Sequence, residues 1–204
     1  ADKITKERLL NGNRDYDDDP TKLYEYDDIC DLFTNHGESG QHYITCDIAR
    51  LGNDHTVAIV WDGWIGRIFS YKKKRTTETA KILQWLQQQY KVKNSDTICD
   101  EDWVGGGVVD QLGCKGFVNN SSPILTPEEK QIRNYKNLKD QCYFELQSVI
   151  ESWKMQLIVM NSDDKELIIE ELDVVKQKNP DKWGKLQILS KEEVKMLIGR
   201  SPDF

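Results

Sequence analysis

Cysteine and histidine are scarce in this sequence, which has five of the first and three of the second in 204 residues. Neither the CxxC nor the HExxH spacing of zinc sites occurs, so a structural or catalytic zinc ion is not expected. The cysteines stand singly and fall mostly within apolar runs, a pattern typical of buried free thiols in a reducing compartment. A disulfide-stabilised secreted domain is therefore disfavoured. The cysteines are Cys30, Cys46, Cys99, Cys114 and Cys142.

Long apolar runs are also missing. No stretch approaches the roughly 18 uninterrupted apolar residues that a membrane span needs, and the N-terminal region is polar, without the hydrophobic segment of a signal peptide. The GxxxxGK[ST] loop that binds nucleotide phosphates is absent too, so ATP hydrolysis is not expected. We expect a soluble, cytoplasmic protein that has no membrane partner.

An excess of basic residues is also missing, because the net charge is −7. Simple nucleic-acid-binding modules usually carry such an excess. An enzyme that gathers carboxylates around cations is acidic at that site, so the net charge does not exclude nucleic-acid binding. The densest basic cluster runs over Lys72, Lys73, Lys74 and Arg75. It fits a contact with a DNA backbone and fits a solvated turn equally well.

The order of predicted elements indicates one α/β domain. A polar lead-in over residues 1–40 carries one short helix around Ile29, Leu32 and Phe33, and the domain itself spans residues 41–204. Its first three strands follow one another directly, with the hairpin signal Asp62-Gly63 between the second and the third. The strands are predicted at 42–47, 56–61, 65–71, 96–99, 115–118 and 186–189, and the helices near 76–90, through 108–112, at 134–153, at 163–175 and after Ser190, with Thr76 or Thr77 capping the first of these.

Three consecutive strands followed by alternating helices and strands are typical of a mixed sheet rather than a plain Rossmann fold. We predict a five-stranded or slightly larger sheet in which strands 1–3 are antiparallel and helices cover both faces. The 38% hydrophobic content allows one sizeable core.

Three aspartates stand at the ends of predicted elements. Asp47 closes the first strand, Asp100 closes the fourth, and Asp203 follows the last helix. If the first and fourth strands are neighbours, Asp47 and Asp100 lie side by side. Converging carboxylates need a compensating cation, and their hard oxygens suit magnesium or manganese. Two such ions, roughly 3.5 to 4 Å apart, could hydrolyse a phosphodiester.

Each aspartate also has an ordinary structural interpretation. An aspartate at a strand end is often a turn former or a helix cap, and Asp54 is more typical of a turn than of a ligand. Asp203 fits a solvated chain end. The glycine run Gly105 to Gly107 lacks the GxGxxG spacing and is interpreted as letting the backbone approach the scissile DNA strand, with a helix N-terminus facing a phosphate.

Four segments resemble the nuclease motifs of the large terminase subunits of tailed phages. Tyr43 to Val57 is similar to the first motif, a strand that ends in Asp followed by a small turn with Gly, Asp and Thr. Asp100 to Leu112 is similar to the second, DxxGxG followed by an apolar pair, Asp and Leu. Tyr135 to Lys139 is similar to the start of the family's long helix, and Ser190 to Glu192 with Gly199 to Asp203 to its closing segment.

The resemblance implies a ribonuclease H-like endonuclease that uses two Mg²⁺ or Mn²⁺ ions to cut concatemeric viral DNA during packaging. Asp47 would bridge both ions, and Asp100 and Asp203 would each hold one side. Asp54, Glu101 and Asp102 would assist through water. The implied partners are double-stranded DNA, an ATPase motor domain, a portal and a small terminase subunit, all in the host cytoplasm during virion assembly. The expected DNA contacts are Lys72, Lys73, Lys74, Arg75, Asn137, Lys139 and Lys191.

The sequence departs from the family pattern in three ways. Trp103 replaces the first glycine of DxxGxG, which leaves Asp102 as an alternative to Asp100. The chain ends at Phe204, where the family continues, and the motor domain that usually precedes the nuclease is absent, which suggests an excised domain. Two other functions fit the same acids: another ribonuclease H-like nuclease, such as a junction resolvase or an integrase core, and a non-catalytic domain that binds metal structurally.

Overall fold

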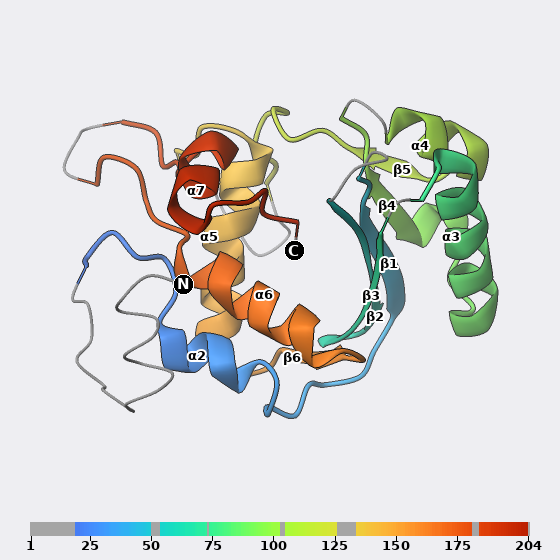
Figure 1. Ribbon diagram of the computed structural model, residues 1–204, viewed down its shortest axis with the longest axis horizontal. Coiled ribbons are helices and arrows are strands. Elements are labelled where there is room, and N and C mark those ends of the chain that lie inside the picture. Colours follow the sequence, from blue (N-terminus) through green and yellow to red (C-terminus); the bar gives the residue numbers. More distant parts are fainter. Residues whose placement is uncertain are drawn as a thin grey trace.

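The computed structural model describes residues 19–49, 54–72, 74–102, 105–125, 134–180 and 184–203. They form a six-stranded sheet with helices on both faces (Figure 1), in the order β5-β4-β1-β2-β3-β6. The elements are α2 (Tyr26–Asp31), β1 (His42–Asp47), β2 (His55–Asp62), β3 (Ile65–Lys72), α3 (Thr76–Tyr90), the 3-10 turn η1 (Asn94–Asp96), β4 (Thr97–Asp100), α4 (Gly106–Leu112), β5 (Lys115–Phe117), α5 (Leu138–Glu151), β6 (Gln156–Val159), α6 (Ser162–Asp173) and α7 (Lys191–Ile198).

The predicted mixed sheet is confirmed, including the antiparallel run β1-β2-β3. The turn between β2 and β3 falls on Gly63, whose φ of +57° is a left-handed conformation that glycine adopts most readily. A Cβ at this position would also lie 2.4 Å from the carbonyl oxygen of Glu38. Strand β4 then returns beside β1 in parallel, as do β5 beside β4 and β6 beside β3. The first and fourth strands are therefore neighbours, as the placement of Asp47 and Asp100 requires.

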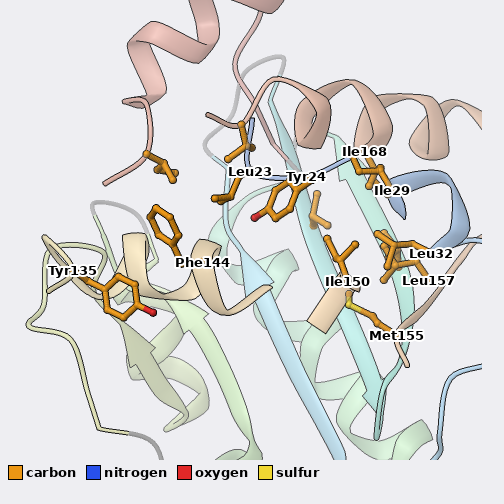
Figure 2. Packing of buried hydrophobic residues seen from close by; sticks show 14 residues of the cluster. Leu23, Tyr24, Ile29, Leu32, Tyr135, Phe144, Ile150, Met155, Leu157 and Ile168 are labelled. Carbon is orange, nitrogen blue, oxygen red and sulfur yellow. The ribbon is translucent and has the colours of Figure 1, made fainter. Parts of the chain in front are cut away.

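Each face of the sheet has its own hydrophobic core. On one face α3 and α4 bury Leu83, Leu86 and Val108 against the sheet. On the other, α2, α5 and α6 cover the sheet, and Figure 2 shows Ile29, Ile150 and Ile168 of these helices close to Leu157 of β6. Because side chains alternate between the two faces of a strand, adjacent residues of β2 and of β3 contribute to opposite cores, as Val57 and Ala58 do.

The short helix expected in the lead-in is α2, and it is part of the second core. Leu23, Tyr24, Ile29 and Leu32 are all buried there, and the carbonyl oxygen of Leu32 accepts a hydrogen bond from the main-chain N–H of Leu157 (2.7 Å). The division of the chain at residue 40 stays a prediction. Among the described residues no helix has the length and apolar character needed to cross a bilayer.

Strand β6 was not predicted, and the strand predicted at 186–189 does not form. Helix α5 ends at Glu151, and the positive φ of Trp153 (57°) redirects the chain so that the next apolar residues pair with β3. Residues 186–189 make single bridges on two sides, Tyr135 with Leu186 and Gln177 with Ile188. Neither bridge extends into a ladder, and the main-chain N–H of Ile188 donates instead to the carboxylate of Asp140 (2.9 Å).

Two helix starts differ from the sequence prediction. Helix α5 begins at Leu138 rather than near residue 134. Helix α3 is preceded by Arg75, so neither Thr76 nor Thr77 is its cap. The carboxylate of Glu78 accepts a hydrogen bond from the main-chain N–H of Arg75 (2.9 Å). This main-chain N–H at the start of the helix therefore has a partner without a threonine cap. The capping box predicted at Ser190 is confirmed.

All five cysteines are free, as predicted. Cys46 and Cys99 are buried next to each other in β1 and β4. The expectation of burial is wrong for Cys142, which is exposed on α5, because its position on the helix faces away from the core.

Candidate active site

Two of the three predicted aspartates lie at one edge of the sheet. Asp47 is the last residue of β1 and Asp100 the last of β4, and the residues before them, Cys46 and Cys99, are paired in the parallel ladder. Because both strands run the same way, their two carboxylates leave the sheet at the same edge. This geometry follows directly from the strand order.

Asp203 reaches the same place from the end of the chain. The segment after α7 runs toward the sheet (Figure 1), and Asp203 meets His55 at the start of β2. One oxygen of Asp203, Oδ2, accepts a hydrogen bond from the main-chain N–H of His55 (3.0 Å) and lies 3.2 Å from Nδ1 of its ring. Asp47, Asp100 and Asp203 together line a cavity of about 310 Å³.

Asp100 faces the cavity, whereas its alternative, Asp102, faces a neighbouring loop. Oδ2 of Asp102 accepts a hydrogen bond from the side-chain amide of Asn119 (2.8 Å). The same amide lies 3.4 Å from Oδ2 of Asp100, and the main-chain N–H of Asp102 donates to Oδ1 of Asp100 (2.9 Å). Asp102 therefore supports Asp100 from behind, through Asn119 and through its own backbone.

The charge balance in the cavity is visible at Asp47. Its carboxylate opens onto the cavity, but crowding by protein removes part of its hydration and raises its pKa to about 6. The nearby negative charges of Asp100 and Asp203 raise the pKa further, and Lys191 opposes them. The net rise means that lost hydration and the two neighbouring carboxylates together outweigh the opposing charge of Lys191.

Two predicted DNA contacts, Lys139 and Lys191, line the cavity at the first turns of α5 and α7. The loop that contains Asn119 is attached to the same end of α5. The carbonyl oxygen of Asn119 accepts a hydrogen bond from the main-chain N–H of Lys139 (3.2 Å). Tyr143, one turn further along α5, also lines the cavity. Burial and the nearby charges of Glu171 and Asp47 raise its pKa to about 12, so it remains a neutral phenol.

Asn137, another predicted DNA contact, is a buried helix cap. Only 7% of it is exposed, its oxygen accepts a hydrogen bond from the main-chain N–H of Asp140 (2.9 Å), and its amide donates to Asn120 (3.2 Å). The polar atoms of Asn137 are thus used within the protein, and its role as a DNA contact stays a prediction.

The basic cluster begins at the same sheet edge as the aspartates. Lys72 is exposed and is paired with His55 across β2 and β3. Arg75 is exposed and Lys74 is half-buried, and neither lines the cavity. Lys73 lies outside the described residues.

Two of the predicted assisting acids lie away from the cavity. Asp54 is exposed just before β2, and it does not line the cavity. The carboxylate of Glu101 lies over Gly116 of β5, where a Cβ would be only 1.8 Å from Oε2. The chain direction at the end of β4 turns Glu101 toward β5, so the role expected for it is not supported by its position.

Gly105 approaches the backbone of the protein itself rather than leaving room for a DNA strand. A Cβ at this position would lie 1.6 Å from the carbonyl oxygen of Asp100. Around Gly107, in contrast, a Cβ would meet no atom within 4 Å from the part of the chain that the structure describes, its own helix backbone aside. The interpretation of the glycine run is corrected on this point: Gly105 allows the chain after β4 to fold back against Asp100.

Glu171 was missed by the sequence analysis. It lines the cavity from α6 and is only 3% exposed. Its sequence signal is its position, since it falls three residues after the buried Ile168 and four before the buried Val175, on the apolar face of the helix. A charged residue on that face requires a partner, which here comes from residues 200–203.

The donor set fits magnesium or manganese by its chemistry, because carboxylate oxygens are the ligands these ions prefer. Within the described ranges, however, no three acidic, histidine or cysteine side chains are gathered closely enough to hold one ion. Asp203 and Asp100 are both engaged in hydrogen bonds to protein groups. The three aspartates line a common space, and binding of one ion by all three would require their side chains to move closer together.

No family model and no curated protein matches the sequence. Among solved structures, the chain is similar to the nuclease domain of the large terminase subunit gp2 of bacterial virus Sf6. Two structures of its K428A mutant, one with calcium and one with manganese and beta-thujaplicinol, give TM-scores of 0.75 and 0.73 at 17% identity, over 89% of this chain and 94% of that chain. The large terminase nuclease of thermophilic phage G20c gives 0.52 at 13% identity, over 89% and 97%. The chain therefore has the ribonuclease H-like fold of the nuclease domains of phage large terminase subunits.

Proposed function

We propose that this domain is a metal-dependent DNA endonuclease that cuts concatemeric viral DNA during genome packaging. The observation that carries the proposal is the cavity lined by Asp47, Asp100 and Asp203, which come from three distant parts of the chain. A fold alone does not define a function. Here the acids occupy the cavity of a fold whose Sf6 representative was solved with manganese and with calcium.

Asp47, Asp100 and Asp203 would hold the two ions, Mg²⁺ or Mn²⁺, with Asp47 between the other two. The bound ions supply an activated water and compensation of charge on the phosphodiester. Lys139 and Lys191 add positive charge at the rim, where they attract and orient the DNA backbone. Asn119 fixes the direction of Asp100, and Tyr143 remains a neutral hydrogen-bond donor.

In this function the substrate is double-stranded DNA, and the domain works beside an ATPase motor domain, a portal and a small terminase subunit in the host cytoplasm. The exposed residues Lys72 and Arg75, near the same sheet edge, would extend the DNA path beyond the cavity. Long duplex substrates should then bind better than short ones.

The test compares Asp47→Asn with Asp54→Asn in a plasmid-nicking assay with Mg²⁺ or Mn²⁺. The two substitutions are chemically identical, but Asp47 lines the cavity and Asp54 does not. We expect Asp47→Asn to lose at least about 100-fold in rate, comparable to the removal of one preorganised charge-stabilising group. Asp54→Asn should stay close to wild type, and similar losses in both variants would contradict the proposal.

Two further measurements separate this function from the alternatives: calorimetric titration with Mn²⁺, and cleavage assays on different DNA substrates. Tight metal binding without cleavage of any DNA would favour a structural metal domain. Cleavage restricted to four-way junctions would favour a resolvase. Cleavage of linear and supercoiled duplex alike supports the terminase function.

A further inference from the structure

The segment that carries Asp203 is attached to α6 by one buried carboxylate. Oε2 of Glu171 accepts a hydrogen bond from the main-chain N–H of Asp203 (2.9 Å). Its other oxygen, Oε1, accepts a hydrogen bond from the guanidinium of Arg200. The two oxygens of Glu171 thus bind both ends of the short segment 200–203.

Asp203 is held from two sides as a result. Its backbone is bound to Glu171, and its carboxylate is bound to His55 at the start of β2. Only 9% of the Asp203 side chain is exposed. An aspartate whose main-chain N–H and carboxylate are both hydrogen-bonded has little freedom of position. Hydrogen bonds that involve a charged group are also stronger than those between two neutral groups.

The neighbouring Glu170 provides a contrast within the same helix. It also binds Arg200, at 2.7 Å, but its side chain is 38% exposed and does not line the cavity. Exposed ion pairs contribute little to stability. Leaving a buried carboxylate without its partners costs much more free energy. Of the two glutamates, Glu171 therefore contributes more to holding the segment 200–203.

We propose that Glu171 is a positioning residue for Asp203. It acts through the main-chain N–H of Asp203 and through Arg200, and it fixes the point at which Asp203 enters the cavity. Both of its oxygens are used in these contacts. The proposal rests on the endonuclease function for its catalytic consequence, although the contact itself can be tested in the metal-free protein.

The first test measures amide hydrogen exchange at Asp203 by NMR in the metal-free protein. We expect Glu171→Ala to accelerate this exchange at least about tenfold, because the N–H loses its acceptor. Glu170→Ala, the matched control, should leave the exchange within about twofold of wild type. Equal protection of the Asp203 amide in both variants would overturn the proposal.

The second test measures Mn²⁺ affinity by calorimetry and nicking kinetics on the same proteins. Loss of a group that orients a metal ligand typically weakens metal affinity about 10 to 100-fold, and we expect this for Glu171→Ala, with a lower kcat and an unchanged KM for DNA. A general loss of structure would instead change KM and thermal unfolding together. If Glu171→Ala does not fold, Glu171→Gln keeps the size of the side chain and one acceptor oxygen, and an intermediate loss of affinity is expected; wild-type affinity in that variant would refute the proposal.

The two proposals can fail separately. A wild-type protein that binds no Mn²⁺ and cleaves no DNA would refute the endonuclease function. The amide exchange of Asp203 would still show whether Glu171 holds its main-chain N–H. A wild-type protein that cleaves DNA, with Glu171→Ala as active as Glu170→Ala, would refute the positioning role alone.

Discussion

Replacing Gly105 by alanine should damage both stability and the candidate site through a single methyl group. The added Cβ would lie 1.6 Å from the carbonyl oxygen of Asp100, and real Cβ atoms essentially never come closer than 3.0 Å. The two segments must therefore separate by at least the difference, 1.4 Å. The clashing atom is backbone, so a side-chain rotation cannot relieve the contact.

The energetic cost follows from overpacking, which is about 1 to 3 kcal/mol for an inserted methyl in a well-packed region. The displacement also falls on the residue that carries a proposed metal ligand. A misplacement of about 1 Å in a catalytic geometry can cost on the order of 100-fold in rate. We therefore expect Gly105→Ala to lose stability and nicking activity together.

Gly107→Ala is the matched control, since it adds the same methyl two residues later. Outside its own helix backbone, no atom of the described residues lies within 4 Å of that Cβ, and the position is helical. Alanine there should stabilise the protein by about 0.5 to 1 kcal/mol and leave nicking unchanged. Urea denaturation and the plasmid assay measure both effects, and the reasoning is refuted if Gly105→Ala is as stable and active as Gly107→Ala.

Three further predictions concern charge and burial. The pKa of Asp47, about 6, lies above its usual 3.8, so the metal-free native state binds a proton that the unfolded chain has released. The contribution of Asp47 to stability should fall as pH rises from about 4 to 6. In urea denaturation with EDTA, the free energy of unfolding of Asp47→Asn should therefore depend less on pH than that of the wild type, and an identical pH dependence would contradict the raised pKa of Asp47. The hydroxyl of Thr79 is buried and has no hydrogen-bond partner among the described residues, so Thr79→Val should raise the free energy of unfolding by about 1 kcal/mol, and a destabilised variant would show that the hydroxyl is satisfied. Lys139→Ala and Lys191→Ala should each reduce the slope of log affinity against log salt by about 1, and substitution of the cluster 72–75 should flatten it as well; unchanged slopes would remove these residues from the DNA path.

The parts of the fold that could be predicted from the sequence are those with local signals. Alternating or continuous apolar runs indicated β1 to β4, the Asp-Gly pair indicated the hairpin at Gly63, and Ser190 with Glu193 formed the predicted capping box. Asp47 and Asp100 could be placed because each directly follows a buried strand. Their proximity then required only the order of the strands.

The parts that could not be predicted depend on contacts between distant segments. β6 is four residues long, and it becomes a strand because the sheet edge of β3 accepts it in parallel. Residues 186–189 have a similar composition but meet only isolated bridges. Glu171 resembles an ordinary charge in an acidic helix until Arg200 and Asp203, about 30 residues later, are seen to bind it.

The three aspartates are held by bonds of different kinds, and this difference bears on how the site can work. Asp47 and Asp100 end strands whose backbone ladders fix them beside each other. Asp203 depends on side-chain contacts to His55 and Glu171, outside any ladder. Because the carboxylates are not gathered around one point among the described residues, a cation that binds all three has to draw some of them inward. The position of Asp203, the third proposed ligand, therefore depends on the contact with α6 more than on the sheet that carries the other two.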